Sequence, residues 1–420
     1  MKTRQKGVLC AVALQLCCSN ERQALPANPI EAQVEALSNC RVVPEYERSL
    51  ERVAVSLSIG DDTLALHNDI LERLPEYTEV LLLTPDILVE RIDNELKNKP
   101  YSDRVRIVEF ATIKIKDGRF FLVRPEKDQL VQVDTVDSFR ARYSGTEWAQ
   151  DLFEVMRGPR GQTVLHISEV YKYYSSVEPK TNSSVVADNG YLKEVSIAGT
   201  EVVRGPLVFQ GGNILYGEVH GRKVVFCGGD VINKTRMVWH GLIGEEMTDA
   251  RIVELIRRIH GADEVVVAAI DAGDRLQPEL MYHLDQAMIP LDGGVVGVSR
   301  IVGNPSVEDA ADRGEGLVKR YLEKLRASLS SSGFKLVDVD MSVENLLRYQ
   351  NYVNAIPYVD ARTLQKTLLM PVFSEQGDWE KEIAKKNIET FESLGYRVIT
   401  VATEADKGKG GIHCLVNVLE

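Results

Sequence analysis

Apolar residues recur at two spacings along this chain, and the two spacings alternate. Stretches with apolar residues three and four positions apart, typical of helices, lead through a short turn into β-branched runs, which favour strands. The pattern occurs four times, at Asp69–Pro75 into Val80–Leu83, Ala250–His260 into Val265–Ile270, Gly316–Leu329 into Lys335–Asp338 and Glu380–Ser393 into Arg397–Val401. Each unit would bury a helix against a strand, so the pattern predicts an α/β fold.

These units indicate an internal repeat. Strand-rich stretches at Phe120–Arg124, Glu194–Ile197 and Lys223–Phe226 lie between them, and a fifth unit is predicted near Val155–Tyr174. Repeated units bury a continuous core only by stacking, so five of them suggest a pseudo-symmetric α/β repeat closed on itself. An ordinary doubly wound α/β fold fits the alternation almost as well, and the pattern alone does not separate the two.

The first residues have a different composition. Met1–Lys6 is basic, and Gly7–Cys18 is almost entirely apolar, which is the layout of a signal peptide. Residues 1–20 are therefore predicted as an export leader. A lipid-anchored form is an alternative because Cys17 and Cys18 close the apolar run, and an amphipathic or disordered leader is another.

A polar segment follows the leader. Residues 21–45 contain Pro, Ala and Asn and indicate a linker, which places the folded domain at 46–420. No later segment is apolar and long enough to be a transmembrane helix. We expect an exported protein that is periplasmic, secreted or lipid-anchored.

Composition narrows the functional classes. The 420 residues are 44% hydrophobic and 27% charged, as in a globular protein with a sizeable core. The formal net charge of −12 argues against nucleic-acid binding, which needs clusters of Lys and Arg to neutralise phosphates. An acidic surface favours cationic ligands only weakly.

The cysteines do not describe a disulfide scaffold. Three of the six lie in the predicted leader, which leaves Cys40, Cys227 and Cys414. An odd, sparse count predicts at least one free thiol in an exported protein, although Cys40 and Cys227 could pair. No CxxC pair has the spacing of a zinc site.

Two segments carry candidate catalytic groups. A GGIHC segment at 410–414 could present the sulfur of Cys414 in a cleft, because the glycines allow a sharp turn. The next residues resemble a strand, in which His413 and Cys414 would point to opposite faces, so His413 is a poor candidate for the base. If residues 283–285 are extended, His283 and Asp285 share one face, where they could move protons and bind a cation. A buried structural Cys and a surface loop are the alternatives.

Three weaker segments contain polar residues in apolar or glycine-rich settings. Asp151 follows Trp148 and would be costly to bury without a partner such as a cationic substrate. The FQGGN segment contains Gln210 and Asn213, and the YVN segment contains Asn354. A helix cap, a hairpin corner and a turn are their alternative interpretations.

The order of these segments resembles that of one family. An Asp after a Trp, then FQGGN, His-x-Asp, YVN and a final GGxHC resemble the agmatine deiminase and bacterial peptidylarginine deiminase branch of the pentein superfamily. The resemblance covers about residues 148–420. It implies a five-bladed pseudo-symmetric α/β propeller, in agreement with the repeat, and a pentein catalytic domain that spans 46–420.

The resemblance also implies the roles of the site residues. Cys414 would be the nucleophile and His283 the acid and base, whereas Asp151, Asp285, Asn354, Gln210 and Asn213 would bind substrate. The implied reaction is hydrolysis of the guanidinium group of arginine, peptidyl-arginine or an arginine derivative. It passes through a Cys thiouronium intermediate to ammonia and a ureido product such as citrulline, without metal or cofactor.

Departures from the family pattern leave alternatives open. Gln150 replaces the expected Arg, and Gln210 stands where relatives often have Glu. The predicted catalytic residues match the family pattern, but residues expected to select the substrate differ from it. The resemblance therefore does not identify the substrate. An amidinotransferase on the same fold and a guanidinium-binding protein without turnover are the alternative functions. The oligomeric state does not follow from the sequence.

Overall fold

The computed structural model describes most of the chain. The described residues are 29–58, 64–110, 113–116, 119–124, 129–132, 141–142, 148–169, 172–174, 185–188, 192, 199–243, 246–269, 277–303, 315–373, 377–403 and 410–420. The predicted leader and the stretch expected at Glu194–Ile197 lie outside them, so both stay predictions.

Five sheets repeat one order of strand pairing. In each, one strand pairs antiparallel with a second, which pairs parallel with a third. The sheets are β9 (Glu154–Arg157), β10 (Thr163–Ile167) and β13 (Thr200–Arg204); β14 (Ile214–Val219), β15 (Arg222–Gly228) and β16 (Glu264–Ala268); β17 (Met288–Leu291), β18 (Val295–Val302) and β19 (Lys335–Ser342); β20 (Ile356–Val359), β21 (Lys366–Phe373) and β22 (Arg397–Thr403); and β23 (Val416–Val418), β2 (Arg52–Ser56) and β3 (Glu79–Pro85).

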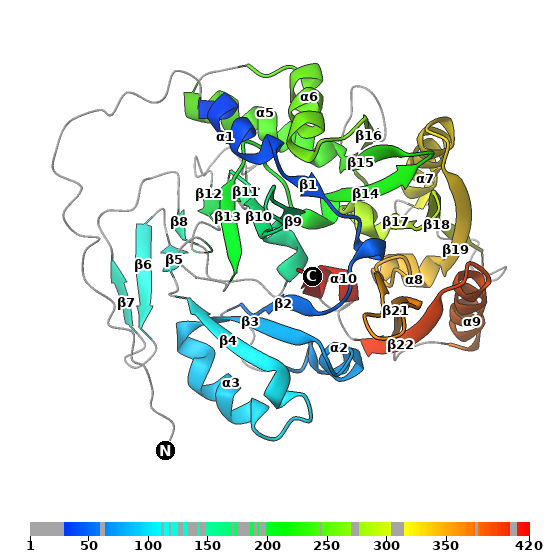
Figure 1. Cartoon of the computed structure of the whole chain (residues 1–420), viewed down its shortest axis with the longest axis horizontal. Coiled ribbons are helices and arrows are strands. Elements are labelled where there is room, and N and C mark those ends of the chain that lie inside the picture. The colour runs from blue at the N-terminus through cyan, green and yellow to red at the C-terminus, as the bar shows by residue number, and fades with distance from the viewer. Residues whose placement is uncertain are drawn as a thin grey trace.

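The remaining strands extend or flank these sheets. β1 (Arg41–Val42) joins β9, and β4 (Val105–Phe110) joins β3. Two further small sheets lie to one side in Figure 1. Their strands are β5 (Ile113–Lys116), β6 (Arg119–Arg124) and β7 (Gln129–Gln132), and β8 (Ala141–Arg142), β11 (Lys172–Tyr174) and β12 (Val185–Asp188).

Helices precede the third strands of four sheets, as the apolar spacing predicts. They are α2 (Asn68–Arg73), α6 (Asp249–His260), α7 (Glu315–Ser331) and α9 (Asp378–Ser393). The other helices are α1 (Pro29–Ser38), α3 (Val89–Leu96), α5 (Gly229–Ile243), α8 (Val343–Leu347) and α10 (Ile412–Leu415). The unit predicted near Val155–Tyr174 corresponds to β9 and β10, which belong to the fifth sheet. The predicted order of helix and strand is confirmed for the other four sheets.

The first strand of each sheet faces a common cavity. Its lining includes Glu154 of β9, Ile214 of β14, Met288 of β17, Pro357 of β20 and Asn417 of β23. In Figure 1 the five sheets lie around the short helix α10. Within the described residues no sheet has more than four strands, so the alternative of one doubly wound sheet is wrong.

The predicted linker is wrong from residue 29 onward. Helix α1 occupies Pro29–Ser38, and Ile30, Val34 and Leu37 are fully buried beside α6. Their spacing of four and three residues is helical, and proline is tolerated in the first turn, where its missing N–H has no helical partner. The polar composition of residues 21–45 predicts a linker because it outweighs these three apolar positions.

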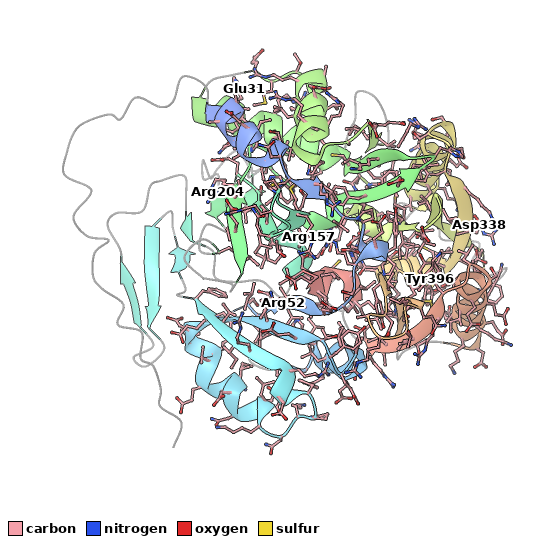
Figure 2. All side chains as sticks on the ribbon, viewed as in Figure 1. Glu31, Arg52, Arg157, Arg204, Asp338 and Tyr396 are labelled. Atoms are coloured by element: carbon pink, nitrogen blue, oxygen red, sulfur yellow. The ribbon has the colours of Figure 1, made fainter. Side chains whose placement is uncertain are left out.

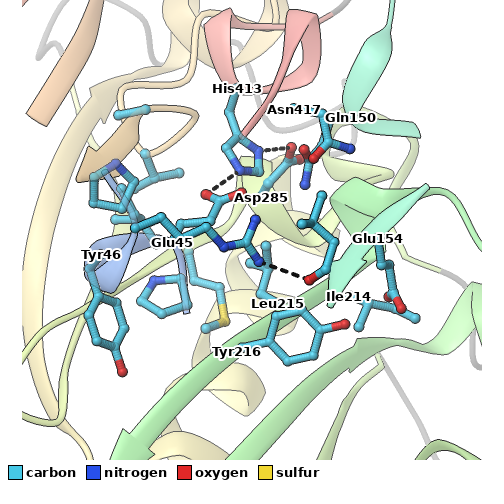
Figure 3. A pocket seen from close by; sticks show the side chains of 18 residues that line it. Glu45, Tyr46, Gln150, Glu154, Ile214, Leu215, Tyr216, Asp285, His413 and Asn417 are labelled. Atoms are coloured by element: carbon cyan, nitrogen blue, oxygen red, sulfur yellow. Dashed lines mark hydrogen bonds and ion pairs between the residues drawn. The ribbon is translucent and has the colours of Figure 1, made fainter. Parts of the chain in front are cut away.

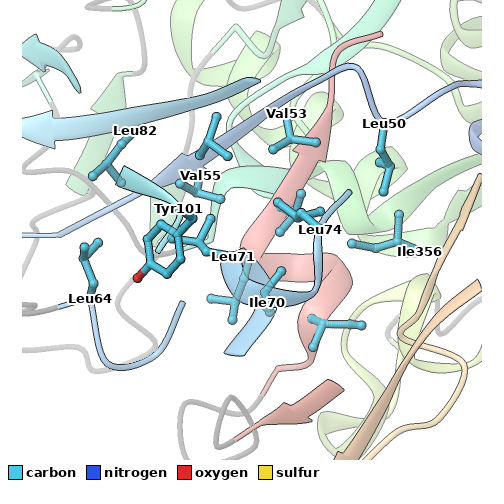
Figure 4. Close-up of a cluster of buried hydrophobic side chains, with 14 of the residues drawn as sticks. Leu50, Val53, Val55, Leu64, Ile70, Leu71, Leu74, Leu82, Tyr101 and Ile356 are labelled. Carbon is cyan, nitrogen blue, oxygen red and sulfur yellow. The ribbon is translucent and has the colours of Figure 1, made fainter. Parts of the chain in front are cut away.

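The C-terminal segment is anchored in the core. β23 pairs with β2, and Ile412 and Leu415 of α10 belong to the apolar cluster drawn in part in Figure 4. Burying an aliphatic side chain of this size contributes about 1.5–3 kcal/mol. At the surface, Arg52 and Arg157, labelled in Figure 2, form ion pairs with Glu420. These contacts fix the position of the residues before β23.

We searched the described helices for one that could cross a membrane, and none combines the length and the hydrophobicity that a span requires.

Candidate active site

Cys414 lies in a helical turn rather than at the start of a strand. α10 covers Ile412–Leu415, and the strand begins only at Val416. Ile412 and Leu415 face the core, whereas Cys414 is 3% exposed and faces other polar groups. The backbone of His413 and Cys414 is therefore helical and not extended as predicted, so the alternation of side chains along a strand does not apply to them.

The two glycines before α10 permit close packing. A Cβ atom at Gly410 would lie 2.6 Å from the Trp148 ring, and one at Gly411 would lie 2.4 Å from Asn354 Oδ1. Any larger residue would push α10 away from these neighbours. The glycines therefore allow α10 to pack closely against Trp148 and Asn354.

Asn354 holds the turn that presents the thiol. Its Oδ1 accepts hydrogen bonds from the backbone N–H groups of His413 (3.0 Å) and Cys414 (3.3 Å). Its Nδ2 donates to Cys414 Sγ at 3.2 Å and to the backbone carbonyl of Asp285 at 3.5 Å. Asn354 therefore connects the thiol to the segment that carries the acid.

His283 and Asp285 do not lie on a strand. A 3-10 helix, η8 (Leu284–Gln286), begins after His283, and the Gln286 side chain accepts from the His283 backbone N–H at 3.2 Å. Asn213 Oδ1 accepts from Leu284 N at 3.1 Å. Both side chains still reach one place, because a Cβ on Gly212 would lie about equally close to Asp285 Oδ2 (2.8 Å) and His283 Nδ1 (3.0 Å).

The side chains of Asp151, Gln210 and His283 form a chain of contacts. Asp151 ends the 3-10 helix η5 (Ala149–Asp151), and its Oδ2 accepts from Gln210 Nε2 at 3.4 Å. With the amide so oriented, Gln210 Oε1 accepts from His283 Nε2 at 3.0 Å. An oxygen only accepts, so Nε2 carries a proton. His283 Nδ1 lies 3.7 Å from Asp151 Oδ1 and faces the site.

Asp285 lies at the centre of the site. Its Oδ2 accepts from His413 Nδ1 at 2.9 Å and lies 3.4 Å from Cys414 Sγ. Its Oδ1 is buried and has no hydrogen-bond partner among the described residues. A carboxylate oxygen left in that state is costly unless a cation or donor arrives, and a ligand could supply either.

A second acid, which no sequence pattern indicates, lies behind Asp285. Figure 3 shows His413 between Asp285 and Glu45, whose Oε2 lies 2.8 Å from His413 Nε2. Glu45 begins the 3-10 helix η1 (Glu45–Glu47) in the segment predicted as linker. Burial opposes the charged imidazole, but the two carboxylates outweigh it and raise the pKa of His413 to about 10. His413 is therefore an imidazolium at neutral pH.

The thiol is held in its neutral form. Burial raises the pKa of Cys414 well above its ordinary value, and the charges of Asp285 and Asp151 raise it further. Hydrogen bonds from the Gly411 backbone and the Asn354 side chain act in the opposite direction but are weaker. The site favours the thiolate only when positive charge enters it.

All seven predicted site residues are brought to one region, although with different surroundings. Cys414, His283 and Asp285 have ligand atoms within 4.8 Å of one another, with Asp151, Gln210 and Asn354 in contact with them. Asn213 instead bonds the backbone of residues 282 and 284, so its contact with substrate stays a prediction. Cys40 and Cys227 are buried free thiols.

Comparison with known proteins gives likeness in structure but not in sequence. No protein-family model matches the chain, and no curated protein matches it. A substrate-bound structure of agmatine deiminase from C. jejuni matches with a TM-score of 0.55 at 14% identity, covering 90% of this chain and 96% of that one. A second structure of C. jejuni agmatine deiminase gives a TM-score of 0.53 at the same identity and coverage.

This chain has the pentein fold. The match covers 90% of this chain and 96% of the other, so it extends over nearly the whole of both. The predicted resemblance in fold is thereby confirmed. At this identity the likeness describes the pentein backbone and leaves the chemistry to the side chains of the site.

Proposed function

We propose that this protein is a hydrolase that releases ammonia from the guanidinium group of arginine, peptidyl-arginine or an arginine derivative. The observation that carries the proposal is the convergence of the Cys414 thiol, the His283 imidazole and the Asp151 and Asp285 carboxylates in one buried site. The C. jejuni agmatine deiminase of the same fold supports it. We interpret the five sheets as the blades of the predicted propeller, with the site at one end of the common cavity.

The two carboxylates suit a planar cation. A guanidinium group presents pairs of N–H donors along its edges, and carboxylates accept such pairs with two parallel hydrogen bonds. Asp285 Oδ1 is buried without a hydrogen-bond partner among the described residues, and Asp151 lies beside His283. A guanidinium held by both would have its central carbon near the sulfur of Cys414, which lies 3.4 Å from Asp285 Oδ2.

The substrate would activate its own nucleophile. The apo site keeps Cys414 as a thiol, because burial and two carboxylates raise its pKa. A bound guanidinium neutralises those charges, which lowers the cost of forming the thiolate. The Cys414 proton passes to His283 Nδ1, and the thiolate attacks the guanidinium carbon to form a tetrahedral adduct.

His283 would move the protons. From its protonated state, Nδ1 gives a proton to one amino nitrogen of the adduct, the C–N bond breaks, and ammonia leaves. The remaining carbon is bound to Cys414 as a thiouronium. His283, now neutral, takes a proton from a water molecule that attacks this carbon. The C–S bond then breaks and the hydroxyl proton is released to solvent, which gives the ureido product, the thiolate and protonated His283.

An assay of products tests this proposal. Purified protein is incubated with arginine, agmatine and an arginine-containing peptide, and both ureido product and ammonia are measured. We expect product that is lost in Cys414→Ala and kept in Cys227→Ala, a matched change of another buried thiol. Ammonia release without an added amine distinguishes hydrolysis from amidino transfer. Absence of product from every substrate contradicts the proposal.

The predicted leader makes an extracytoplasmic substrate part of the proposal. Export would expose the enzyme to peptides and to scavenged arginine, so we expect the arginine peptide or arginine to be turned over faster than agmatine. Cell fractionation, with the mass of the mature N-terminus, tests export directly. Full-length protein confined to the cytosol would remove this argument.

A further inference from the structure

A second buried cluster lies outside the proposed active site. Glu154 of β9, His166 of β10 and His260 at the end of α6 are all nearly or fully buried. Glu154 Oε2 lies 2.8 Å from His166 Nδ1 and 2.8 Å from His260 Nε2. The three ligand atoms lie within 4.8 Å of one another. The reaction proposed above makes no use of this cluster.

The position of His260 is fixed by the end of its helix. α6 is capped at its start by Thr248 and ends at Gly261, whose φ of +57° is readily adopted by glycine. His260 Nδ1 lies 2.7 Å from the carbonyl oxygen of Ile256 one turn earlier. A carbonyl oxygen only accepts, so Nδ1 carries the ring hydrogen.

This tautomer leaves a lone pair opposite a carboxylate. When Nδ1 of a neutral imidazole is protonated, Nε2 is an acceptor, yet His260 Nε2 faces Glu154 Oε2 at hydrogen-bond distance. Two acceptors at 2.8 Å require something positive between them. Either a second proton makes His260 an imidazolium, or a metal cation accepts both lone pairs.

The surroundings favour a metal over a lone proton. Glu154 Oε1 is buried and forms no hydrogen bond with either imidazole among the described residues, so a second carboxylate oxygen could also contact a metal. The Tyr216 hydroxyl interacts with the Glu154 side chain, and both residues line the common cavity. A fourth ligand, either water or this hydroxyl, has a place there.

The neighbouring cation does not occupy the cluster. Arg48 is buried in the same cavity, but its guanidinium donates to the backbone carbonyls of Val43, Val155 and Val418. No hydrogen bond joins it to Glu154 within the described residues. The Glu154 carboxylate is therefore available to the two imidazoles and to a cation bound between them.

We propose that Glu154, His166 and His260 bind a divalent metal ion of the zinc class. Two imidazole nitrogens and one carboxylate oxygen are a known zinc donor set, and the carbonyl of Ile256 is the outer partner that orients a metal-bound imidazole. Bonds of about 2.0–2.1 Å would widen the present 2.8 Å separations to about 3.3 Å in a tetrahedron, which needs only small side-chain shifts.

The site would have a structural role. Its ligands come from two neighbouring sheets of the fold, with β9 and β10 on one side and α6, which precedes β16, on the other. A metal would therefore join the β9–β10–β13 sheet to the unit that contains α6 and β16. Because an ion that binds only the folded chain stabilises it, the ion should raise the melting temperature of the protein.

Cobalt provides the test, because it adopts zinc geometry and absorbs visible light. Full-length protein is treated with a chelator, dialysed, and titrated with Co²⁺, with metal content then measured by mass spectrometry. We expect one ion per chain, visible absorption bands of a four-coordinate site, and a rise in melting temperature of several degrees. Zn²⁺ should displace the colour.

Matched variants assign the ion to this cluster. Glu154→Gln and His260→Gln should bind Co²⁺ at least about a hundredfold more weakly. Cys414→Ala, which removes a ligand from the other buried cluster, and His67→Gln, a fully buried histidine elsewhere, should retain the ion. Uptake lost in Cys414→Ala and kept in Glu154→Gln would overturn the proposal.

The wild-type protein alone also decides the question. If the variants do not fold, the Co²⁺ spectrum and the metal-dependent melting temperature of the wild type remain measurable. Chelator-treated protein that takes up no Co²⁺ or Zn²⁺ and shows no change in melting temperature would overturn the site. None of these measurements depends on turnover.

Discussion

The two buried clusters of this protein have opposite ratios of acid to imidazole. Around Cys414, three carboxylates, those of Glu45, Asp151 and Asp285, surround two imidazoles. In the second cluster one carboxylate lies between two imidazoles. An excess of carboxylate attracts a bulky cation with N–H donors, whereas an excess of imidazole lone pairs attracts a metal ion. Burial alone therefore does not distinguish the two kinds of site.

The largest expected effect comes from removing the central acid of the Cys414 site. Asp285→Asn keeps the shape but loses the charge that would bind a guanidinium, so we expect kcat/KM to fall by about a thousandfold or more. Steady-state kinetics with the best substrate measure it. Asp378→Asn, at an exposed position in the first turn of α9, is the matched control. Turnover within tenfold of wild type in Asp285→Asn would contradict the assigned role.

The fold could be predicted from the sequence because each unit is local. A helix and its following strand lie within about thirty residues of each other, so apolar spacing reveals both. The sequence does not show how the units associate, because that depends on pairing between strands far apart, such as β23 with β2. Helix α1 was missed because its apolar positions, Ile30, Val34 and Leu37, lie in a segment of polar composition.

The site residues likewise fall into two groups, those in local sequence segments and those brought together only by the fold. Cys414, His283 and Asp285 fall in short segments whose order resembles a family, so they could be named. Glu45 gave no signal because it is 368 residues from its partner His413. His413 was set aside on the assumption of a strand, which the turn of α10 contradicts. Glu154 and His260 are 106 residues apart, so their pairing follows only from the fold.

The next effect concerns the stability of the folded protein at high pH, which depends on His413 in the Cys414 site. In the folded protein the pKa of His413 is raised from 6.5 to about 10 by Glu45 and Asp285. The folded state therefore holds a proton that the unfolded chain loses. The resulting stability is complete below about pH 6.5 and is lost as the pH rises through about 10. We expect unfolding by denaturant to become easier across this window, by a few kcal/mol at most.

Glu45→Gln isolates that contribution. Removing one carboxylate should make the fall in stability between pH 7 and pH 10 shallower, because His413 would then hold its proton less tightly. Glu47→Gln changes an exposed acid in the same short helix and should leave the slope unchanged. Parallel slopes in wild type and Glu45→Gln would show that His413 is not charged as proposed.

A smaller effect should appear in the reactivity of the thiol. Because burial, Asp285 and Asp151 raise the pKa of Cys414, little thiolate exists in the apo protein near pH 7. We expect a neutral alkylating reagent to modify Cys414 at least about tenfold more slowly than a free cysteine, with the site followed by peptide mass spectrometry. Asp285→Asn should speed the reaction. Rapid alkylation of the apo wild type would contradict activation by substrate.

The smallest effect concerns the fourth position of the proposed metal site. Tyr216→Phe removes a hydroxyl group beside Glu154, and the Tyr216 ring lies 5.6 Å from that of His260. If this hydroxyl only positions a metal-bound water, Co²⁺ affinity should fall by about tenfold, as for other outer partners of metal ligands. Tyr46→Phe, a tyrosine that lines the same cavity but bonds Glu218, is the control. A loss as large as that in Glu154→Gln would instead make Tyr216 a ligand, which would give the imidazole-rich cluster a closed, four-ligand site.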